Sequence, residues 1–150
     1  MPKQCFIMVG VSGSGKTTWL ANNHPDALIC SADDYHMKHE VYRFDGANLN
    51  LAYQASIRKF VDGCVRGVEK IASDNTNASI DQLAPYYMIA SSYGYEVNII
   101  RLVVKPDECF KRNSHGTPSE TCVRQNRSIF FMMEALPVYW KYTFTKFAGY

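Results

Sequence analysis

The stretch Gly10-Val11-Ser12-Gly13-Ser14-Gly15-Lys16-Thr17-Thr18 determines the fold that this sequence predicts. It matches the pattern G-x-x-x-x-G-K-[ST] at every fixed position. The apolar run Cys5-Phe6-Ile7-Met8-Val9 precedes it and suits a buried parallel strand, and the residues from Thr17 to Ala21 can open a helix. A strand, a glycine-rich loop and a helix in this order predict a phosphate-binding loop.

The chemistry of this loop follows from the charge of a polyphosphate. Backbone N–H groups in a glycine-rich turn, followed by a helix N-terminus, form a concave positive surface. Lys16 would add a point charge near the outer phosphates, and the hydroxyl of Thr17 would ligate Mg²⁺ held by those phosphates. The residues expected around the phosphates are Gly10, Ser12, Gly13, Ser14, Gly15, Lys16, Thr17 and Thr18.

Composition indicates one ordinary globular domain over residues 1–150. The apolar fraction is 47%, the charged fraction is 20%, and the net charge of +2 is too small to indicate nucleic-acid binding by itself. Five cysteines, an odd number without a C-x-x-C pair, are typical of a reduced intracellular protein. Because no signal-peptide pattern or membrane-length apolar run is present, we expect a cytoplasmic protein without a membrane partner.

Hydrophobic periodicity divides the rest of the chain into alternating strands and helices. Short apolar runs predict strands at 27–30, 68–72 and 95–104, and three-four spacing predicts helices at 47–67 and 79–94. A short helix at 107–112 and a longer one from 117 complete the pattern, and the aromatic residues of 136–150 are expected to pack onto the domain. The prediction is an α/β fold with a four-stranded, mostly parallel sheet and helices on both faces.

Polar clusters follow two of the predicted strands. Asp33 and Asp34 come after the second strand, and Ser73-Asp74-Asn75-Thr76-Asn77 follows the third. Ligands of open α/β sheets bind at the carboxyl ends of the strands, beside the phosphate loop. The alternatives are a helix N-cap for one aspartate and an ordinary Asn/Asp turn for the second cluster.

Basic residues near the end of the chain predict a short lid. Residues 111–118 are polar, basic and glycine-bearing, and Arg112 lies within them, whereas Arg124 lies in the helix that follows. Phosphoryl transfer to a hydroxyl requires cations over the moving phosphoryl group and a carboxylate that takes the acceptor's proton, for which Asp33 is the candidate. A switch GTPase would carry N-K-x-D, which is missing, so a small kinase explains these parts most simply.

Five segments together resemble the 5′-kinase domain of the T-even phage polynucleotide kinase family, without its phosphatase domain. They are Gly13 to Trp19, Asp33-Asp34-Tyr35, Ser73 to Asn77, Lys111-Arg112-Asn113-Ser114 and Leu136-Pro137-Val138-Tyr139. The Asp-Asn-Thr-Asn run also resembles a broader group of small P-loop kinase-like proteins, some of them fused to other domains that act on nucleic acid. The resemblance covers nearly the whole chain, from Gly10 to about Tyr139.

The resemblance implies roles for matching positions. Lys16, Asp33 and Arg112 would be catalytic, with Asp33 as the general base that activates the 5′-hydroxyl and Arg112 as a lid arginine near the donor phosphates. Asp74 matches an aspartate on the acceptor side, and Arg124 aligns with an arginine after the lid, which we group with the donor-binding residues. The implied cofactors are ATP, as phosphate donor, and Mg²⁺.

Two positions depart from the family pattern. His36 stands where the family has an arginine three residues after the catalytic aspartate, and His115 lies where a second lid arginine is missing. Histidine is only partly charged near neutral pH, so contacts of these two residues with the acceptor's phosphate and ordinary surface positions are both open interpretations.

The sequence thus predicts an ATP-dependent kinase that phosphorylates the 5′-hydroxyl end of DNA or RNA, with nucleic acid and nucleotide as its partners. One alternative is a kinase of a small hydroxylated metabolite or nucleoside, which would use the same donor residues with a different acceptor pocket. Another is a nucleotide-binding module that acts through a partner protein rather than as a kinase.

Overall fold

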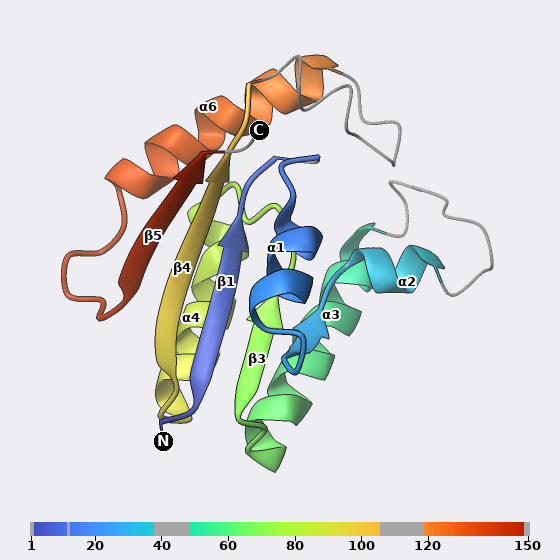
Figure 1. The fold of residues 1–150 in the computed structure, drawn as a ribbon, viewed down its shortest axis with the longest axis vertical. Helices are drawn as coiled ribbons and strands as arrows, with labels where there is room; N and C mark the ends of the chain where they lie inside the picture. The colour runs from blue at the N-terminus through green and yellow to red at the C-terminus, as the bar shows by residue number, and fades with distance from the viewer. Residues whose placement is uncertain (1, 12, 38–48, 106–118, 149–150) are drawn as a thin grey trace.

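The computed structural model describes residues 2–11, 13–37, 49–105 and 119–148. They form an α/β fold around a five-stranded sheet with the strand order β2-β3-β1-β4-β5 (Figure 1). The strands are β1 Gln4–Val9, β2 Leu28–Cys30, β3 Lys70–Ser73, β4 Glu96–Val103 and β5 Thr143–Ala148. The helices are α1 Lys16–Asn23, α2 Asp33–Met37, α3 Leu49–Arg66, α4 Ile80–Ser92 and α6 Ser119–Glu134.

Every strand pair in this sheet is parallel. The central strand β1 pairs with β3 on one side and β4 on the other, and β2 and β5 form the two edges. Parallel neighbours end at the same edge of the sheet, so the segments that follow β1, β2 and β3 lie together there. The parallel sheet, with the phosphate loop after its central strand, is the α/β arrangement that the sequence predicts.

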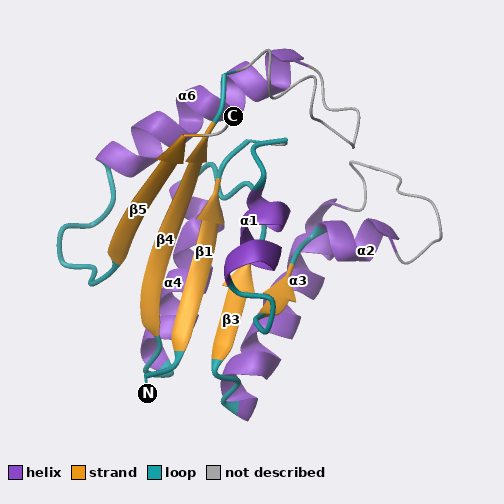
Figure 2. Cartoon of the chain, in the orientation of Figure 1, coloured by secondary structure: helices purple, strands orange, loops and turns teal. Residues whose placement is uncertain are grey.

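The helices cover both faces of the sheet, with α1 in front and α4 behind in Figure 2. Alternate residues of β1 point to opposite faces, as the pleat of a strand requires. Cys5, Ile7 and Val9 belong to the core that contains the buried residues of α3, α4 and α6. Phe6 and Met8 pack instead in a smaller core with residues of α1.

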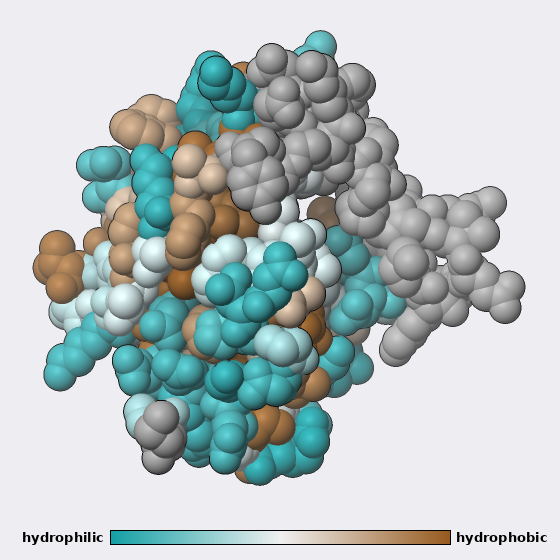
Figure 3. Space-filling view, in the orientation of Figure 1, coloured by the Kyte–Doolittle hydropathy of each residue, from teal (hydrophilic) through white to brown (hydrophobic). Residues whose placement is uncertain are grey.

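The prediction of four strands is wrong, because residues 143–148 form a fifth strand beside β4. The segment TFTKFA is rich in β-branched and aromatic residues, but five of its six positions are exposed, so it lacks the apolar run of a buried strand. The predicted packing of the aromatic tail is confirmed for Trp140, whose ring stacks on Tyr87 with centroids 4.0 Å apart. Elsewhere apolar groups reach the surface on the side of the molecule where β5 and its preceding loop lie (Figure 3). Val138, in that loop, is fully exposed.

Ser79 and Gln82 have the spacing of a capping box at the start of α4, but their contacts differ from that motif. Ser79 occupies the N-cap position, but its side chain makes no capping hydrogen bond. Gln82 instead accepts a hydrogen bond at Oε1 from the backbone N–H of Ala78, at 2.9 Å. Pro85 lies inside the helix rather than in its first turn.

Two predicted elements lie outside the described residues, the helix at 107–112 and the lid at 111–118. Among the helices that the structure describes, none is long and apolar enough to cross a membrane.

Candidate active site

Backbone hydrogen bonds join the ends of β1, β2 and β3 into one edge. The N–H of Gly10, directly after β1, donates to the carbonyl oxygen of Thr76 at 3.2 Å. The N–H of Asp74, directly after β3, donates to the carbonyl oxygen of Cys30 at 2.9 Å. Three segments that are far apart in the sequence therefore meet at the carboxyl edge of the sheet.

The phosphate loop has a backbone that only glycine adopts readily at two positions. Gly13 and Gly15 have φ angles of 83° and 96°, in the left-handed region. Gly10 is needed for a different reason, because a Cβ there would lie 2.5 Å from Ser14 Oγ and 3.0 Å from the carbonyl oxygen of Leu102. The glycines of the motif are thus required by loop shape and by close packing.

The loop leads directly into α1, whose N-terminus faces it. Gly15 is the N-cap and offers no side-chain capping bond, and no acidic residue lies in the first turn. Thr18 lies exposed in that turn. Lys16 Nζ donates to the carbonyl oxygens of Gly10 at 2.9 Å and Val11 at 3.1 Å, so its charge is held over the loop. Backbone amides and the Lys16 ammonium give this loop the positive character that a polyphosphate requires.

Ser14 adds an unusual buried hydroxyl to the loop. Its residue is 2% exposed, and among the described residues its Oγ has no hydrogen-bond partner. A buried hydroxyl without a partner is costly, and a phosphate oxygen would supply that partner. The residues of this loop fit a bound nucleotide.

Thr17 and Asp74 form the closest link between the loop and the end of β3. Thr17 Oγ1 donates to Asp74 Oδ2 at 2.7 Å. Burial raises the pKa of the Asp74 carboxyl, the Thr17 hydrogen bond and Lys16 oppose this shift, and Asp33 and Asp34 add to it. A hydroxyl beside a buried carboxylate is an oxygen set that suits Mg²⁺. The family resemblance implies an acceptor-side role for Asp74, whereas this contact lies beside the phosphate loop.

Asp33 and Asp34 open α2 and have different surroundings. The backbone N–H of Asp33 donates to Ser31 Oγ at 3.1 Å. Ser31 therefore accepts a hydrogen bond at the start of α2, where one alternative of the sequence analysis is an aspartate N-cap. Asp34 is exposed and pairs with Lys59 Nζ of α3 at 3.5 Å. Asp33 is half-buried, and its charge, like that of Asp34, adds to the raised pKa of Asp74. Of the two acids, Asp33 is the more buried at this edge of the sheet.

A buried polar network that the sequence analysis missed supports this edge. Asn75 Oδ1 accepts a hydrogen bond from the backbone N–H of Ala32 at 2.8 Å. Asn75 Nδ2 donates to Tyr86 OH at 3.2 Å and lies 3.4 Å from Ser56 Oγ, and these two hydroxyls lie 2.7 Å apart. The network joins α3, α4 and the end of β3 to the residue before Asp33. The dense polar run after β3 was its only sequence signal.

Asn77, in the same polar run after β3 as Asn75, holds the end of β1 in place. It is fully buried, and its Nδ2 donates to the carbonyl oxygen of Met8 at 2.8 Å and to Ser73 Oγ at 3.2 Å. Its φ of 48° lies in the left-handed region, which Asn tolerates better than most residues. Asn75 and Asn77 are therefore framework residues of the site.

The remaining predicted residues are not brought together in the part of the chain that the structure describes. Ser12, Arg112 and His115 lie outside the described residues. His36 belongs to α2, three positions after Asp33, but its side chain is not described. Arg124 is exposed on α6, where its Nη2 lies 3.5 Å from Thr121 Oγ1 of the same helix. Its expected role toward the donor stays a prediction.

Comparison with known proteins agrees with this geometry. The model of a protein family described as an AAA domain matches residues 6–126. The chain belongs to this family. This AAA domain is 28% identical over 125 residues to human NEDD4-binding protein 2, a match that covers 79% of the chain and 7% of that protein. It thus spans only a small part of that relative's length.

Solved structures with the same fold include kinases. A chain of the Pnkp1/Rnl/Hen1 RNA repair complex superposes with a TM-score of 0.75 at 14% identity, covering 93% of the present chain and 47% of that chain. Shikimate kinase from Acinetobacter baumannii, in complex with shikimate, gives a TM-score of 0.55 at 14% identity, covering 97% of the present chain and 84% of the kinase chain. These likenesses show that the chain shares its fold with kinases.

Proposed function

We propose that this chain is an ATP-dependent kinase that transfers the γ-phosphate to the 5′-hydroxyl end of DNA or RNA. The observation that carries the proposal is the meeting of the phosphate loop, Asp74 and Asp33 at one edge of the sheet. A loop that binds a phosphate donor needs no second carboxylate, whereas transfer to a hydroxyl needs one to take the proton. Asp33 meets that need.

The contacts of the donor-side residues suggest a separate role for each of them in the transfer. The loop amides and Ser14 bind the phosphates, and Lys16 neutralises charge on their outer oxygens. Thr17 and Asp74 would hold Mg²⁺, which when bound neutralises the negative charge that develops during transfer. Asp33 accepts the proton of the acceptor hydroxyl, and Asn75 fixes the backbone before it through the Ala32 N–H.

A polynucleotide acceptor is supported by the family resemblance of the sequence and by likeness to a chain from an RNA repair complex. A small-molecule acceptor has a specific observation in its favour as well, since shikimate kinase shares the fold. The motifs favour the polynucleotide, because Asp33-Asp34-Tyr35 after β2 and Ser73 to Asn77 after β3 both resemble the phage family, which the chain leaves at His36.

Labelled ATP distinguishes these functions directly. The chain would be incubated with γ-labelled ATP, Mg²⁺ and one acceptor at a time: a 5′-hydroxyl oligonucleotide, the same oligonucleotide with a 5′-phosphate, a nucleoside or a small hydroxylated metabolite. We expect label only on the 5′-hydroxyl oligonucleotide. Label on the nucleoside or metabolite alone would refute the polynucleotide assignment, and no transfer to any acceptor would favour a nucleotide-binding module.

A further inference from the structure

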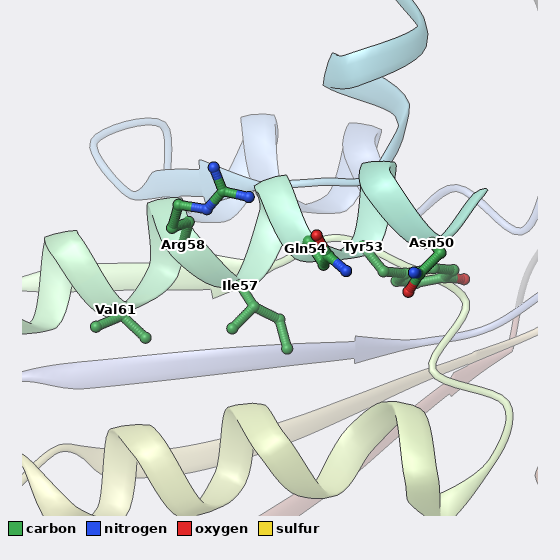
Figure 4. Close-up of a pocket in the computed structure, with 6 residues that line it drawn as sticks. All are labelled: Asn50, Tyr53, Gln54, Ile57, Arg58 and Val61. Atoms are coloured by element: carbon green, nitrogen blue, oxygen red, sulfur yellow. The ribbon is translucent and has the colours of Figure 1, made fainter. Parts of the chain in front are cut away.

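A pocket of about 540 Å³ lies along one face of α3. The described residues that line it recur at helical spacing along α3, namely Asn50, Tyr53, Gln54, Ile57, Arg58 and Val61. Arg58 lies at the edge of this stripe, and its side chain points away from Ile57 and Val61 in Figure 4. This stripe is distinct from the buried face of α3, which includes Ala52, Ser56 and Phe60. We name this pocket the α3 groove.

The groove begins at the candidate active site. In Figure 4 the arrowhead of β1 points toward the end of α3 that carries Asn50 and Tyr53, so this end lies at the carboxyl edge of the sheet. Hydrogen bonds through Asn75 join the backbone N–H of Ala32, the residue before Asp33, to Ser56 of α3. Tyr53 lies three residues before Ser56, nearly one helical turn closer to this edge. The groove therefore begins near the start of α2 and runs toward Val61.

The lining of the groove has the chemistry of a single-stranded nucleic-acid site. Tyr53 supplies an aromatic ring, Ile57 an apolar wall, and Gln54 an amide that can donate and accept. Arg58 supplies an exposed cation five residues after Tyr53, about 7.5 Å farther along the helix axis. Sites for single strands combine stacking aromatic rings with cations that follow the phosphate backbone.

We propose that the α3 groove binds the acceptor strand beyond its 5′-terminal nucleoside, with a base stacked on Tyr53 and a phosphate held by Arg58. This inference rests on the proposed function, because it places the 5′-hydroxyl of that strand at Asp33. It assigns the acceptor to one strand rather than a duplex end, since a base that stacks on Tyr53 has left its own helix.

Binding without ATP tests the groove separately from catalysis. Fluorescence anisotropy would measure the Kd of a labelled 5′-hydroxyl hexanucleotide for wild type, Arg58→Ala and Tyr53→Ala. We expect each substitution to raise Kd by about five-fold or more, and Tyr53→Phe to keep near wild-type affinity because its ring still stacks. Arg58→Ala should also reduce the slope of log Kd against log salt by about 0.7, the loss of one phosphate contact on a single strand.

Arg66→Ala is the matched control, because Arg66 lies on the same helix, outside the groove, in an exposed pair with Asp62. Equal Kd values for Arg58→Ala and Arg66→Ala, or for Tyr53→Ala and wild type, would overturn the groove assignment. Transfer from ATP is then measured on the same variants. Binding that depends on Arg58, without transfer to any oligonucleotide, would refute the proposed kinase function but support the groove assignment. Transfer by variants whose Kd values are unchanged would support the kinase function and refute the groove assignment.

Discussion

Truncation of Asn75 tests the buried network beneath the site. Asn75→Ala removes the acceptor of the Ala32 N–H, at 2.8 Å, and the amide that donates to Tyr86 OH, at 3.2 Å. The hydroxyls of Ser56 and Tyr86 keep each other as partners, at 2.7 Å. The main cost is therefore one buried backbone N–H left without an acceptor, which is about 1 to 3 kcal/mol. We expect the free energy of unfolding to fall by about 2 kcal/mol, a large share of the roughly 5 to 15 kcal/mol of a typical domain.

Urea unfolding followed by circular dichroism measures this change. With a slope of about 2 kcal/mol per molar urea, the midpoint should fall by about 1 M. The matched control is Asn23→Ala, because Asn23 Nδ2 also donates to a backbone carbonyl, that of Trp19 at 2.9 Å, but on the exposed surface. It should change stability by less than about 0.5 kcal/mol. If Asn75→Ala unfolded at the same urea concentration as Asn23→Ala, the network would have no structural role and the reasoning would be refuted.

Three further substitutions test the donor half of the site. In a steady-state assay, Thr17→Val should reduce kcat by about 10- to 100-fold and raise the Mg²⁺ concentration required for half-maximal activity. Thr17→Ser, which keeps the hydroxyl, should retain activity in the same assay. Gly10→Ala should weaken ATP binding measured by calorimetry, because its Cβ would lie 3.0 Å from the Leu102 carbonyl oxygen. Gly94→Ala, which strains a left-handed backbone with φ of 81° just before β4, should lower stability without weakening ATP binding. The raised pKa of Asp74 means that its ionised form opposes folding above that pKa. Asp74→Asn should therefore be more stable than wild type at pH 7 in EDTA. The urea midpoints of the two proteins should converge as the pH falls through the raised pKa of Asp74 toward 4. A difference between the two midpoints that does not change with pH would contradict this.

Local patterns predicted most of the architecture because each buried element has its own signal. The phosphate loop combines fixed glycines with a preceding apolar strand, and α3 carries a clear three-four periodicity. Strand β5 was missed because an exposed edge strand needs no continuous apolar run, and its aromatic residues resemble a packed tail.

The candidate site was predictable only where one segment carries the chemistry. The positions of Lys16 and Thr17 follow from the motif itself. The Thr17 to Asp74 contact joins residues 57 positions apart, and the Ser56 to Tyr86 contact joins residues 30 apart. Such contacts depend on strand order, which periodicity does not specify, so the buried network and the place of Asp74 beside the loop required the structure.

Replacement of the proposed base tests the central claim most directly. Transfer of labelled phosphate from ATP to a 5′-hydroxyl oligonucleotide would be compared for Asp33→Asn and its neighbour Asp34→Asn, together with the Kd of each variant for ATP. We predict that Asp33→Asn loses about 100-fold or more in kcat with ATP affinity unchanged, whereas Asp34→Asn, which removes an exposed ion pair with Lys59, stays close to wild type. Near-normal turnover by Asp33→Asn would show that Asp33 is not the base and would contradict the proposed mechanism.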